Sequence, residues 1–261
     1  MNEKNLDYLK DTLKYLGFGE AAATQLERAL KEGKPEFTIS VQAEYNRQQV
    51  EALLHFRKSN QTELYFFNKY DATLKQGTDA AAYRQATFHI NKGNGMTLKE
   101  AFNLLNGRAV YKNLERKDGQ AYQAWVQLDL KQKHSNGQYP VNMYHQRYGF
   151  DLEKVLAAHP IKELQDGAQK EALLRSLQKG NLQSVTMLTE VGQERRFLEA
   201  APQFKSINQY DEQLKPIRNQ QDKTVGLEAG REPRQKQQAL AGDEEVGELK
   251  KNRSRKKGLS I

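Results

Sequence analysis

Apolar residues recur every three or four positions over two segments at the start of the chain. The first segment runs from residue 6 to 16 and is followed by Gly17, and the second runs from 22 to 30 and is followed by Gly33. This spacing places the apolar side chains on one face of a helix, and glycine is favoured just beyond a helix end. The pattern predicts two amphipathic helices before Pro35.

After Pro35 the apolar spacing changes to every second residue, which is typical of a half-buried strand. We expect strands at 37–43, 50–56, 63–67 and 84–90, although the second of these also contains residues that favour a helix. Together with the two helices, these strands predict a first domain, residues 1–92, that ends in an antiparallel meander.

The order of a helix followed by a meander recurs twice in residues 93–214. A capping box at Thr97 and Glu100 predicts a helix, followed by strands at 108–114, 120–130 and 139–146. Asp151 begins another helix, and a further helix at 169–178 precedes strands at 183–189, 194–200 and 203–210. The predicted fold class is α+β: two small domains, 1–92 and 93–214, built of helix-then-antiparallel-meander units, plus a disordered basic C-terminal tail, 215–261.

Two kinds of string recur at corresponding places in these units. Leu-x-x-Gly closes three predicted helices, at 30–33, 104–107 and 177–180, and N-x-Y-D-x-x-L occurs at 68–74 and 208–214. We interpret them as signs that the chain reuses one structural module. The alternative is that Leu-x-x-Gly is only a common helix ending and that the second string is a coincidence. Asp71 and Asp211 are expected to cap turns that leave their strands, with paired acid–base carboxylates as the alternative.

Apolar periodicity disappears from about Pro216 onward. The segment 215–261 has no aromatic residue, and its 12 basic and seven acidic residues give it +5 of the net charge of +8. Such a segment buries too little surface to offset the entropy of ordering, so we expect it to be disordered when alone. Its end holds six basic residues that are candidates for contacting nucleic acid: Lys250, Lys251, Arg253, Arg255, Lys256 and Lys257.

The composition narrows the classes of protein to consider. The chain of 261 residues has no cysteine, which excludes disulfides, thiolate metal sites and a cysteine nucleophile. The first residues lack the apolar stretch of a secretory signal, and no run approaches the ~18 apolar residues of a membrane span. We expect a cytoplasmic protein that does not enter a membrane.

Several longer segments carry a resemblance to a known family. They are NLDYLKDTLKYLGFGE and HFRKSNQTELYFFNKYDATL in the first predicted domain, and TLKEAFNLLNGRAVYKNL, YGFDLEKVLAAHPIKEL and PQFKSINQYDEQ in the second. The chain resembles a family of uncharacterised proteins carried by conjugative transposons and plasmids of Bacteroides and relatives, over most of residues 1–214. The resemblance implies cytoplasmic work for a mobile element, near genes for topoisomerase and mobilisation functions. The family supplies no established catalytic residues, so the resemblance assigns none.

The sequence has no arrangement that identifies a catalytic, cofactor or metal site. Its five histidines lack a ligand spacing such as H-E-x-x-H, although His145 and His159 would meet if the segment between them folded back. The glycines of Gly93-Asn94-Gly95 lack the rest of a phosphate-binding motif, so this segment is expected to be a connector. We therefore predict no catalytic residue, no cofactor and no metal.

Aromatic and basic residues mix on several predicted strands: Tyr65, Phe67, Lys69, Tyr111, Lys112, Arg116, Tyr122 and Trp125. Such side chains stack on bases and neutralise phosphates, so they are candidates for a nucleic-acid surface, with the core as the alternative place for the rings. Because Val126, Leu128 and Leu130 make the more continuous apolar face of their strand, Trp125 is expected to be exposed.

These observations favour a binding protein over an enzyme. We expect a non-enzymatic accessory module of a mobile genetic element that docks DNA-processing machinery and contacts DNA or RNA through its basic tail. The partner protein would come from the same element, and the oligomeric state is left open. The alternatives are an enzyme whose site is not visible in the sequence and a scaffold that binds only proteins.

Overall fold

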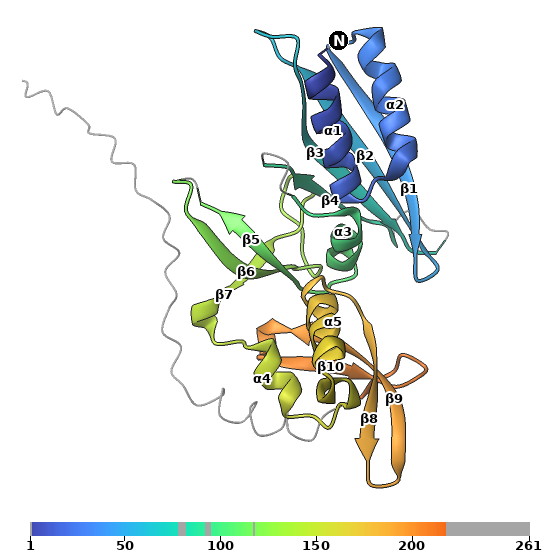
Figure 1. Ribbon diagram of the computed structural model, residues 1–261, viewed down its shortest axis with the longest axis vertical. Coiled ribbons are helices and arrows are strands. Elements are labelled where there is room, and N and C mark those ends of the chain that lie inside the picture. Colours follow the sequence, from blue (N-terminus) through green and yellow to red (C-terminus); the bar gives the residue numbers. More distant parts are fainter. Residues whose placement is uncertain (1, 78–81, 92–94, 117, 218–261) are drawn as a thin grey trace, which may run out of the picture. The chain divides into compact units, whose positions relative to one another are not determined.

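A computed structural model of the protein describes residues 2–77, 82–91, 95–116 and 118–217 (Figure 1). All of these residues belong to one compact unit. The fold class is α+β, with helices and three antiparallel sheets, as the alternating sequence patterns predicted.

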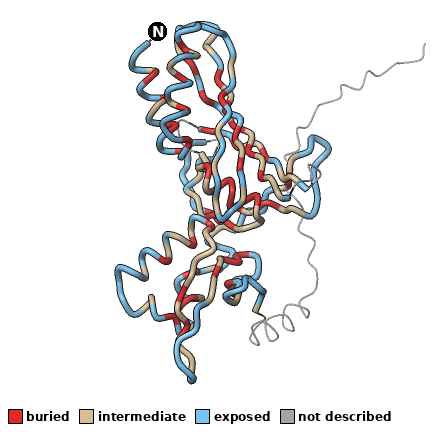
Figure 2. The backbone as a smooth tube through the Cα atoms, turned by 90° about the vertical axis from the view of Figure 1, so that its right-hand side faces the viewer, coloured by how far each residue is buried: buried red, intermediate tan, exposed pale blue. Residues whose placement is uncertain are grey.

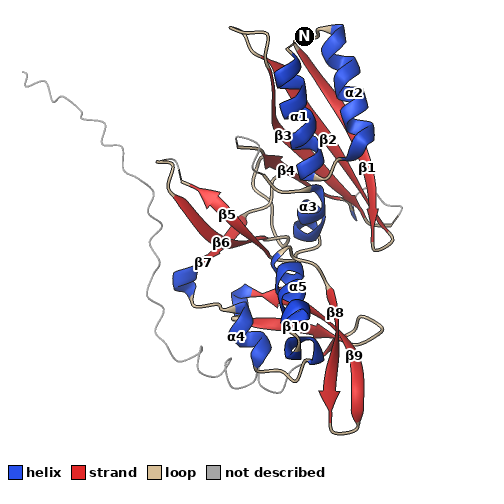
Figure 3. Ribbon diagram, viewed as in Figure 1, coloured by secondary structure: helices blue, strands red, loops and turns tan. Residues whose placement is uncertain are grey.

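Two helices cover one face of the first sheet. Helices α1 (Glu3–Leu16) and α2 (Gly19–Glu32) lie side by side on strands β1 (Glu36–Tyr45), β2 (Gln48–Lys58), β3 (Tyr65–Lys75) and β4 (Arg84–His89), which pair in that order (Figure 3). The apolar face of each helix and the inward residues of the strands form the first core, and buried positions are red in Figure 2. The ambiguous segment at 50–56 is a strand, because both neighbouring strands pair with it.

The second unit begins with α3 (Leu98–Leu105), where Thr97 and Glu100 form the predicted capping box. Strands β5 (Val110–Glu115), β6 (Ala121–Leu128) and β7 (Val141–His145) follow as a three-stranded meander. Most side chains of α3 are buried, and its apolar residues belong to the same first core as the first sheet. This core spans the predicted boundary at residue 92, so a division into two domains there stays a prediction.

The third unit holds the remaining helices and the third sheet. Helix α4 (Leu152–Ala157) is capped by Asp151, as predicted, and α5 (Gly167–Gln178) precedes strands β8 (Gln183–Thr189), β9 (Gly192–Ala201), β10 (Ser206–Tyr210) and β11 (Pro216–Ile217). Short 3-10 helices lie between these elements: η2 (Gln146–Tyr148), η3 (Lys162–Gln165) and η4 (Pro202–Phe204). The strands pair in sequence order, so each of the three units places a helix before an antiparallel meander.

The three Leu-x-x-Gly strings are helix endings of one kind. In each string the glycine N–H donates to the leucine carbonyl, and the glycine φ is positive: 70° at Gly33, 82° at Gly107 and 76° at Gly180. Glycine adopts this left-handed conformation without the steric cost that a Cβ imposes. A shared local requirement therefore explains the recurrence of this string.

The two N-x-Y-D strings occupy different backbone settings, so the prediction that they mark one repeated position is wrong. The first lies inside β3, where the pairing with β2 skips Asn68 and both Phe67 and Tyr70 point into the core. The second ends β10 and enters a turn, with regular alternation up to Tyr210. A bulge adds one residue to a strand and changes which side chains share a face. This bulge explains why Tyr70 is fully buried and Tyr210 is not.

The third sheet reaches further along the chain than predicted. Pro216 and Ile217, which the sequence assigns to the tail, form β11 and pair with Tyr210 and Gln209. The tail boundary at 215 is therefore too early, because a two-residue strand leaves no periodicity in the sequence. Residues 218–261, including the six candidate contacts between 250 and 257, lie outside the described residues, as do residues 92–94. The predictions for these segments stay predictions.

Candidate functional site

Three aromatic side chains lie in one row across the second sheet. Tyr111 on β5 is the direct partner of Trp125 on β6, and Trp125 is the direct partner of Tyr144 on β7. The ring centroids of Tyr111 and Trp125 are 5.2 Å apart, and the Phe150 ring meets Trp125 edge-on at 5.3 Å. Neighbouring strands are about 4.8 Å apart, so the row extends over roughly 10 Å. We call Tyr111, Trp125 and Tyr144 the aromatic row.

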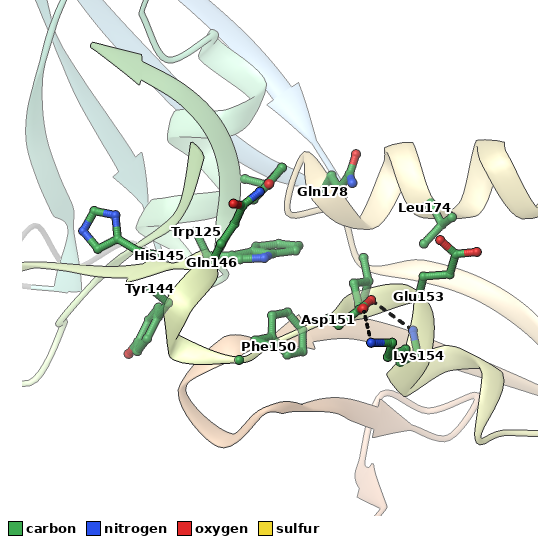
Figure 4. Close-up of a pocket in the computed structure, with 13 residues that line it drawn as sticks. Trp125, Tyr144, His145, Gln146, Phe150, Asp151, Glu153, Lys154, Leu174 and Gln178 are labelled. Carbon is green, nitrogen blue, oxygen red and sulfur yellow. Dashed lines mark hydrogen bonds and ion pairs between the residues drawn. The ribbon is translucent and has the colours of Figure 1, made fainter. Parts of the chain in front are cut away.

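The aromatic row lines an open groove that the second sheet shares with helices α4 and α5. Two hollows, of about 460 and 680 Å³, share Tyr111 and Gln178 in their linings, and we refer to the two together as the groove. Figure 4 shows the first hollow, with Phe150 near Trp125 and Leu174 on α5. The second hollow has a different lining: Tyr15, Glu100, Lys112, Asn113, Gln123, Arg175 and Lys179.

Amide side chains lie beside the aromatic row. Asn113 and Gln123 are cross-strand partners, and the Gln123 amide donates to Asn113 Oδ1 over 2.8 Å. The Tyr111 hydroxyl donates to Gln123 Oε1 over 2.9 Å, and the Gln146 amide donates to the same oxygen over 3.5 Å. These bonds hold the amides in fixed positions, where their remaining donors and acceptors can meet the polar edge of a ligand.

The carboxylates at the α4 end of the groove have structural partners. Asp151 Oδ1 accepts the Lys154 N–H over 3.2 Å, and Asp151 Oδ2 lies 3.4 Å from the Lys154 ammonium, as the dashed lines in Figure 4 show. The backbone hydrogen bond from Lys154 lowers the pKa of Asp151 below its usual value. Glu153 pairs with Lys170 on α5. These groups cap a helix and join two helices.

The second hollow has an excess of basic side chains. Lys112 and Glu100 form an ion pair over 2.9 Å, with only 11% and 9% of their side chains accessible. Glu100 also accepts the Thr97 N–H, so both of its roles are internal to the fold. Arg175 and Lys179 are exposed and give this end of the groove two positive charges beyond the neutral Lys112–Glu100 pair.

A buried polar cluster fixes the end of α5 against α3. Asn103 is fully buried, and its amide donates to the Lys179 carbonyl over 2.7 Å and to Asn181 Oδ1 over 3.0 Å. Arg108 donates to Asn103 Oδ1 over 2.7 Å and to the Gly180 carbonyl over 2.9 Å. Burial lowers the pKa of the Arg108 guanidinium, which still stays charged at neutral pH. A buried network with its partners in place is rigid, so the backbone that carries Lys179 is held in position.

The structure places three of the aromatic candidates in a core. Tyr65 and Phe67 are buried in the first core, which was the alternative place for their rings, so they are not available to stack on bases. The prediction that Trp125 is exposed is wrong, since only 5% of it is accessible. The reason is that β6 lies between two cores. Val126 and Leu128 pack in the first core, while Trp125 packs on the other side of the strand in a second core, which it forms with apolar residues of α4, α5 and the third sheet.

Other candidates lie on different surfaces. The Arg116 guanidinium is 5.6 Å from the centre of the Tyr122 ring, and alternation puts Tyr122 on the opposite face of the sheet from Trp125. Lys69 on β3 is the cross-strand partner of His55 and His89 on the first sheet. Of the basic and aromatic candidates, the groove thus brings together Tyr111, Lys112 and Trp125.

The two carboxylates of the N-x-Y-D strings have unrelated partners. Asp71 lies within a strand, where Thr87 donates to it and His55 Nε2 is 2.7 Å from its Oδ2, so the prediction that it caps a turn is wrong. Burial raises the pKa of Asp71, but the hydrogen bonds from Thr87 and His55 outweigh burial and leave the pKa lowered. Asp211 accepts the N–H groups of Gln213 and Lys215, which confirms its predicted role in a turn.

The histidines do not converge. His145 lies against the Tyr122 ring at 5.3 Å, whereas His159 Nδ1 is 3.5 Å from the Gln209 amide. Within the described ranges, no group of three or more histidines and carboxylates could hold a metal ion.

Sequence reasoning missed several residues of the groove, above all Tyr15, Tyr144, Arg175 and Lys179. The alternation of the strand at 139–146 was a usable signal for Tyr144, since it places this residue opposite Trp125 once the register is known. Arg175 and Lys179 look like ordinary polar positions of a surface helix. Their importance comes only from the elements that α5 packs against.

The comparisons with known proteins identify no relative: no family model, curated protein or solved structure matches this chain. Among the helices that the structure describes, none has the length and apolar character needed to cross a membrane.

Proposed function

We propose that the protein is a non-enzymatic accessory module that binds single-stranded nucleic acid in the groove and contacts further phosphates through its basic tail. The observation that carries the proposal is the aromatic row, Tyr111, Trp125 and Tyr144, in register on three strands and lining an open groove. Proteins that hold single strands place aromatic rings beside a basic channel, because every base has a face that can stack.

The degree of burial of the three rings suits the binding of a single strand. Trp125 is buried and fixes the middle of the row, while Tyr111 and Tyr144 remain partly exposed on either side of it. The neighbouring amides of Asn113 and Gln123 supply donors and acceptors for base edges. Stacking in such sites is worth about 1–3 kcal/mol per base and tolerates different bases.

The contacts of the polar groups support a binding role over a catalytic one. Asp151, Glu153 and Glu100 all line the groove, and each is engaged in a helix cap or an ion pair of the described chain. The resemblance to proteins of conjugative elements supports a place beside DNA-processing machinery, with which the protein would dock.

Replacement of the partly exposed rings tests the proposal. The double variant Tyr111→Ala/Tyr144→Ala is titrated with labelled fifteen-nucleotide thymidine and uridine strands and with a duplex, and binding is followed by fluorescence anisotropy. Stacking is worth about 1–3 kcal/mol per base, so the loss of each ring should weaken binding to single strands by about 5- to 150-fold. The variant Tyr111→Phe/Tyr144→Phe keeps the rings and should bind nearly as well as the wild type.

A matched control is Phe204→Ala, which removes an exposed ring outside the groove. Its affinity should equal that of the wild type. If Tyr111→Ala/Tyr144→Ala binds as tightly as Phe204→Ala, with folding verified by circular dichroism, the aromatic row has no part in the function. Absence of binding by the wild type at low salt would overturn the nucleic-acid proposal and leave a protein as the ligand.

A further inference from the structure

We propose that the second hollow is a phosphodiester subsite, in which Arg175 and Lys179 hold one phosphate of the strand and Tyr15 and Tyr111 contact the adjoining bases. This inference rests on the proposed function and assigns the direction in which the strand leaves the aromatic row, toward α1. It requires a positive site that is fixed in position and that shares its hollow with rings a base can reach.

The positions of Arg175 and Lys179 satisfy the first requirement. They are four residues apart at the end of α5, so their side chains emerge on one face of the helix. Arg175 has Glu171 as a neighbour at 3.5 Å, but 66% and 70% of these side chains are accessible, and exposed pairs of this kind are weak. A phosphate offers the guanidinium a bidentate hydrogen bond instead.

The charges around the hollow are complementary to a phosphate. Glu100 is the acidic side chain of the lining, and it is neutralised by Lys112. An anion entering the hollow therefore meets a net positive lining from Arg175 and Lys179. The α4 end of the groove, by contrast, carries Asp151 and Glu153 with Lys154 and has no such excess.

The second requirement is met by the buried cluster around Asn103. The Lys179 carbonyl accepts from Asn103 over 2.7 Å, and the Gly180 carbonyl accepts from Arg108 over 2.9 Å. Gly180 allows this approach, because a Cβ there would lie 2.8 Å from the Ala109 carbonyl oxygen. A cation on a fixed backbone loses less entropy when it binds, and this favours affinity.

Two rings line the same hollow as the basic residues. Tyr15 is 63% accessible at the end of α1 and lines the second hollow, as does Tyr111. An accessible tyrosine of this kind, without a core to pack in, is well placed to stack on a base. Asn113 and Gln123 line the same hollow and can bond to the base or sugar.

The test measures the salt dependence of binding. The full-length variant Arg175→Gln/Lys179→Gln is compared with the wild type and with Lys131→Gln/Lys162→Gln, which removes the same charge at two exposed positions outside the groove. The probes are the fifteen-nucleotide thymidine and uridine strands, and the two arms distinguish DNA from RNA as the source of the phosphodiester. Anisotropy titrations run from 50 to 200 mM salt.

Each neutralised phosphate of a single strand contributes about 0.7 to the log–log salt slope, so the loss of one phosphate contact should make the slope of the groove variant smaller by about 0.7. The affinity advantage of the wild type should then shrink by about 2.6-fold between 50 and 200 mM salt. The control variant should keep the salt slope of the wild type. Tyr15→Ala should weaken binding, whereas Tyr8→Ala, at another exposed position of α1, should not.

The outcomes separate the two proposals. A groove variant with the slope of the control overturns the phosphate subsite, while binding that still depends on Tyr111 and Tyr144 leaves the proposed function in place. A wild type that binds neither strand overturns both.

Discussion

Replacement of Gly180 by alanine should destabilise the protein far more than the same change at another helix ending. Gly180 has a φ of +76°, and an added Cβ would lie 2.8 Å from the Ala109 carbonyl oxygen and 2.9 Å from Val110 Cγ2. The first of these is a backbone atom of Ala109, directly before β5, so the close approach cannot be relieved without moving α5 away from the sheet. Such a movement stretches the hydrogen bonds that Asn103 and Arg108 make to this segment.

The magnitude follows from three contributions. The left-handed conformation costs an alanine about 1–2 kcal/mol, and the loss of glycine's freedom in the unfolded chain returns about 0.4–1 kcal/mol. Weakening of buried hydrogen bonds adds about 1–3 kcal/mol. We expect Gly180→Ala to lower the free energy of unfolding by about 2–4 kcal/mol.

Gly33→Ala is the matched control. Its φ is +70°, it ends a helix through the same Leu-x-x-Gly string, and none of the described atoms comes within 4 Å of its added Cβ. Only the conformational cost remains, so the loss should be about 0.5–1 kcal/mol. Urea unfolding of the two full-length variants, followed by far-UV circular dichroism, gives the comparison. Equal losses at the two positions would refute the argument that close packing at Gly180 holds α5 in place.

Three further predictions concern other parts of the chain. Arg47, with a φ of +61°, occupies the second position of the two-residue turn between β1 and β2, where glycine is preferred, so Arg47→Gly should raise the free energy of unfolding by a few tenths to about 1 kcal/mol in urea. The pKa of Asp71 is lowered in the folded state, so the ionised carboxylate stabilises the fold fully above the unfolded pKa of about 4, and this stabilisation is lost as the pH falls through the folded pKa. Asp71→Asn should therefore flatten the acid limb of a stability–pH curve, and an unchanged limb would contradict this. Trp125 should have blue-shifted fluorescence that iodide barely quenches, and a strong red shift would contradict its burial.

The fold was largely predictable from local patterns. Residues 50–56 alternate so clearly that their strand could be identified against a competing helical propensity, and the capping box at Thr97 and Glu100 located the start of α3. These features depend on neighbours within a few residues. The bulge at Asn68 is different, because it arises from the pairing of β3 with β2 and has no counterpart in the periodicity of either strand alone.

The candidate site was harder to predict because it depends on contacts between distant segments. Trp125 was predicted to be exposed because the other face of β6 is the more continuously apolar one. In the structure both faces are covered, because α5 and the third sheet supply a second core for the face that carries Trp125. Asn103 helps to fix the end of α5 that carries Arg175 and Lys179, and nothing near either residue in the sequence signals that contact. The available hint was an asparagine within the apolar run AFNLL of α3.

Asn103 also has a consequence for how the chain is made. Its amide partner Asn181 lies 78 residues further on, which at about 5–20 residues per second is roughly 4–16 s of translation. During that interval residues of the first sheet and α3 have already been made, but the Asn103 amide nitrogen lacks both of its partners, Lys179 and Asn181. The side of α3 that receives α5 therefore stays in contact with water until residues 179–181 have been synthesised. Completion of the N-terminal part thus waits for these residues, and a ribosome that stalls before Asn181 leaves the α5-facing side of α3 uncovered for chaperones to recognise.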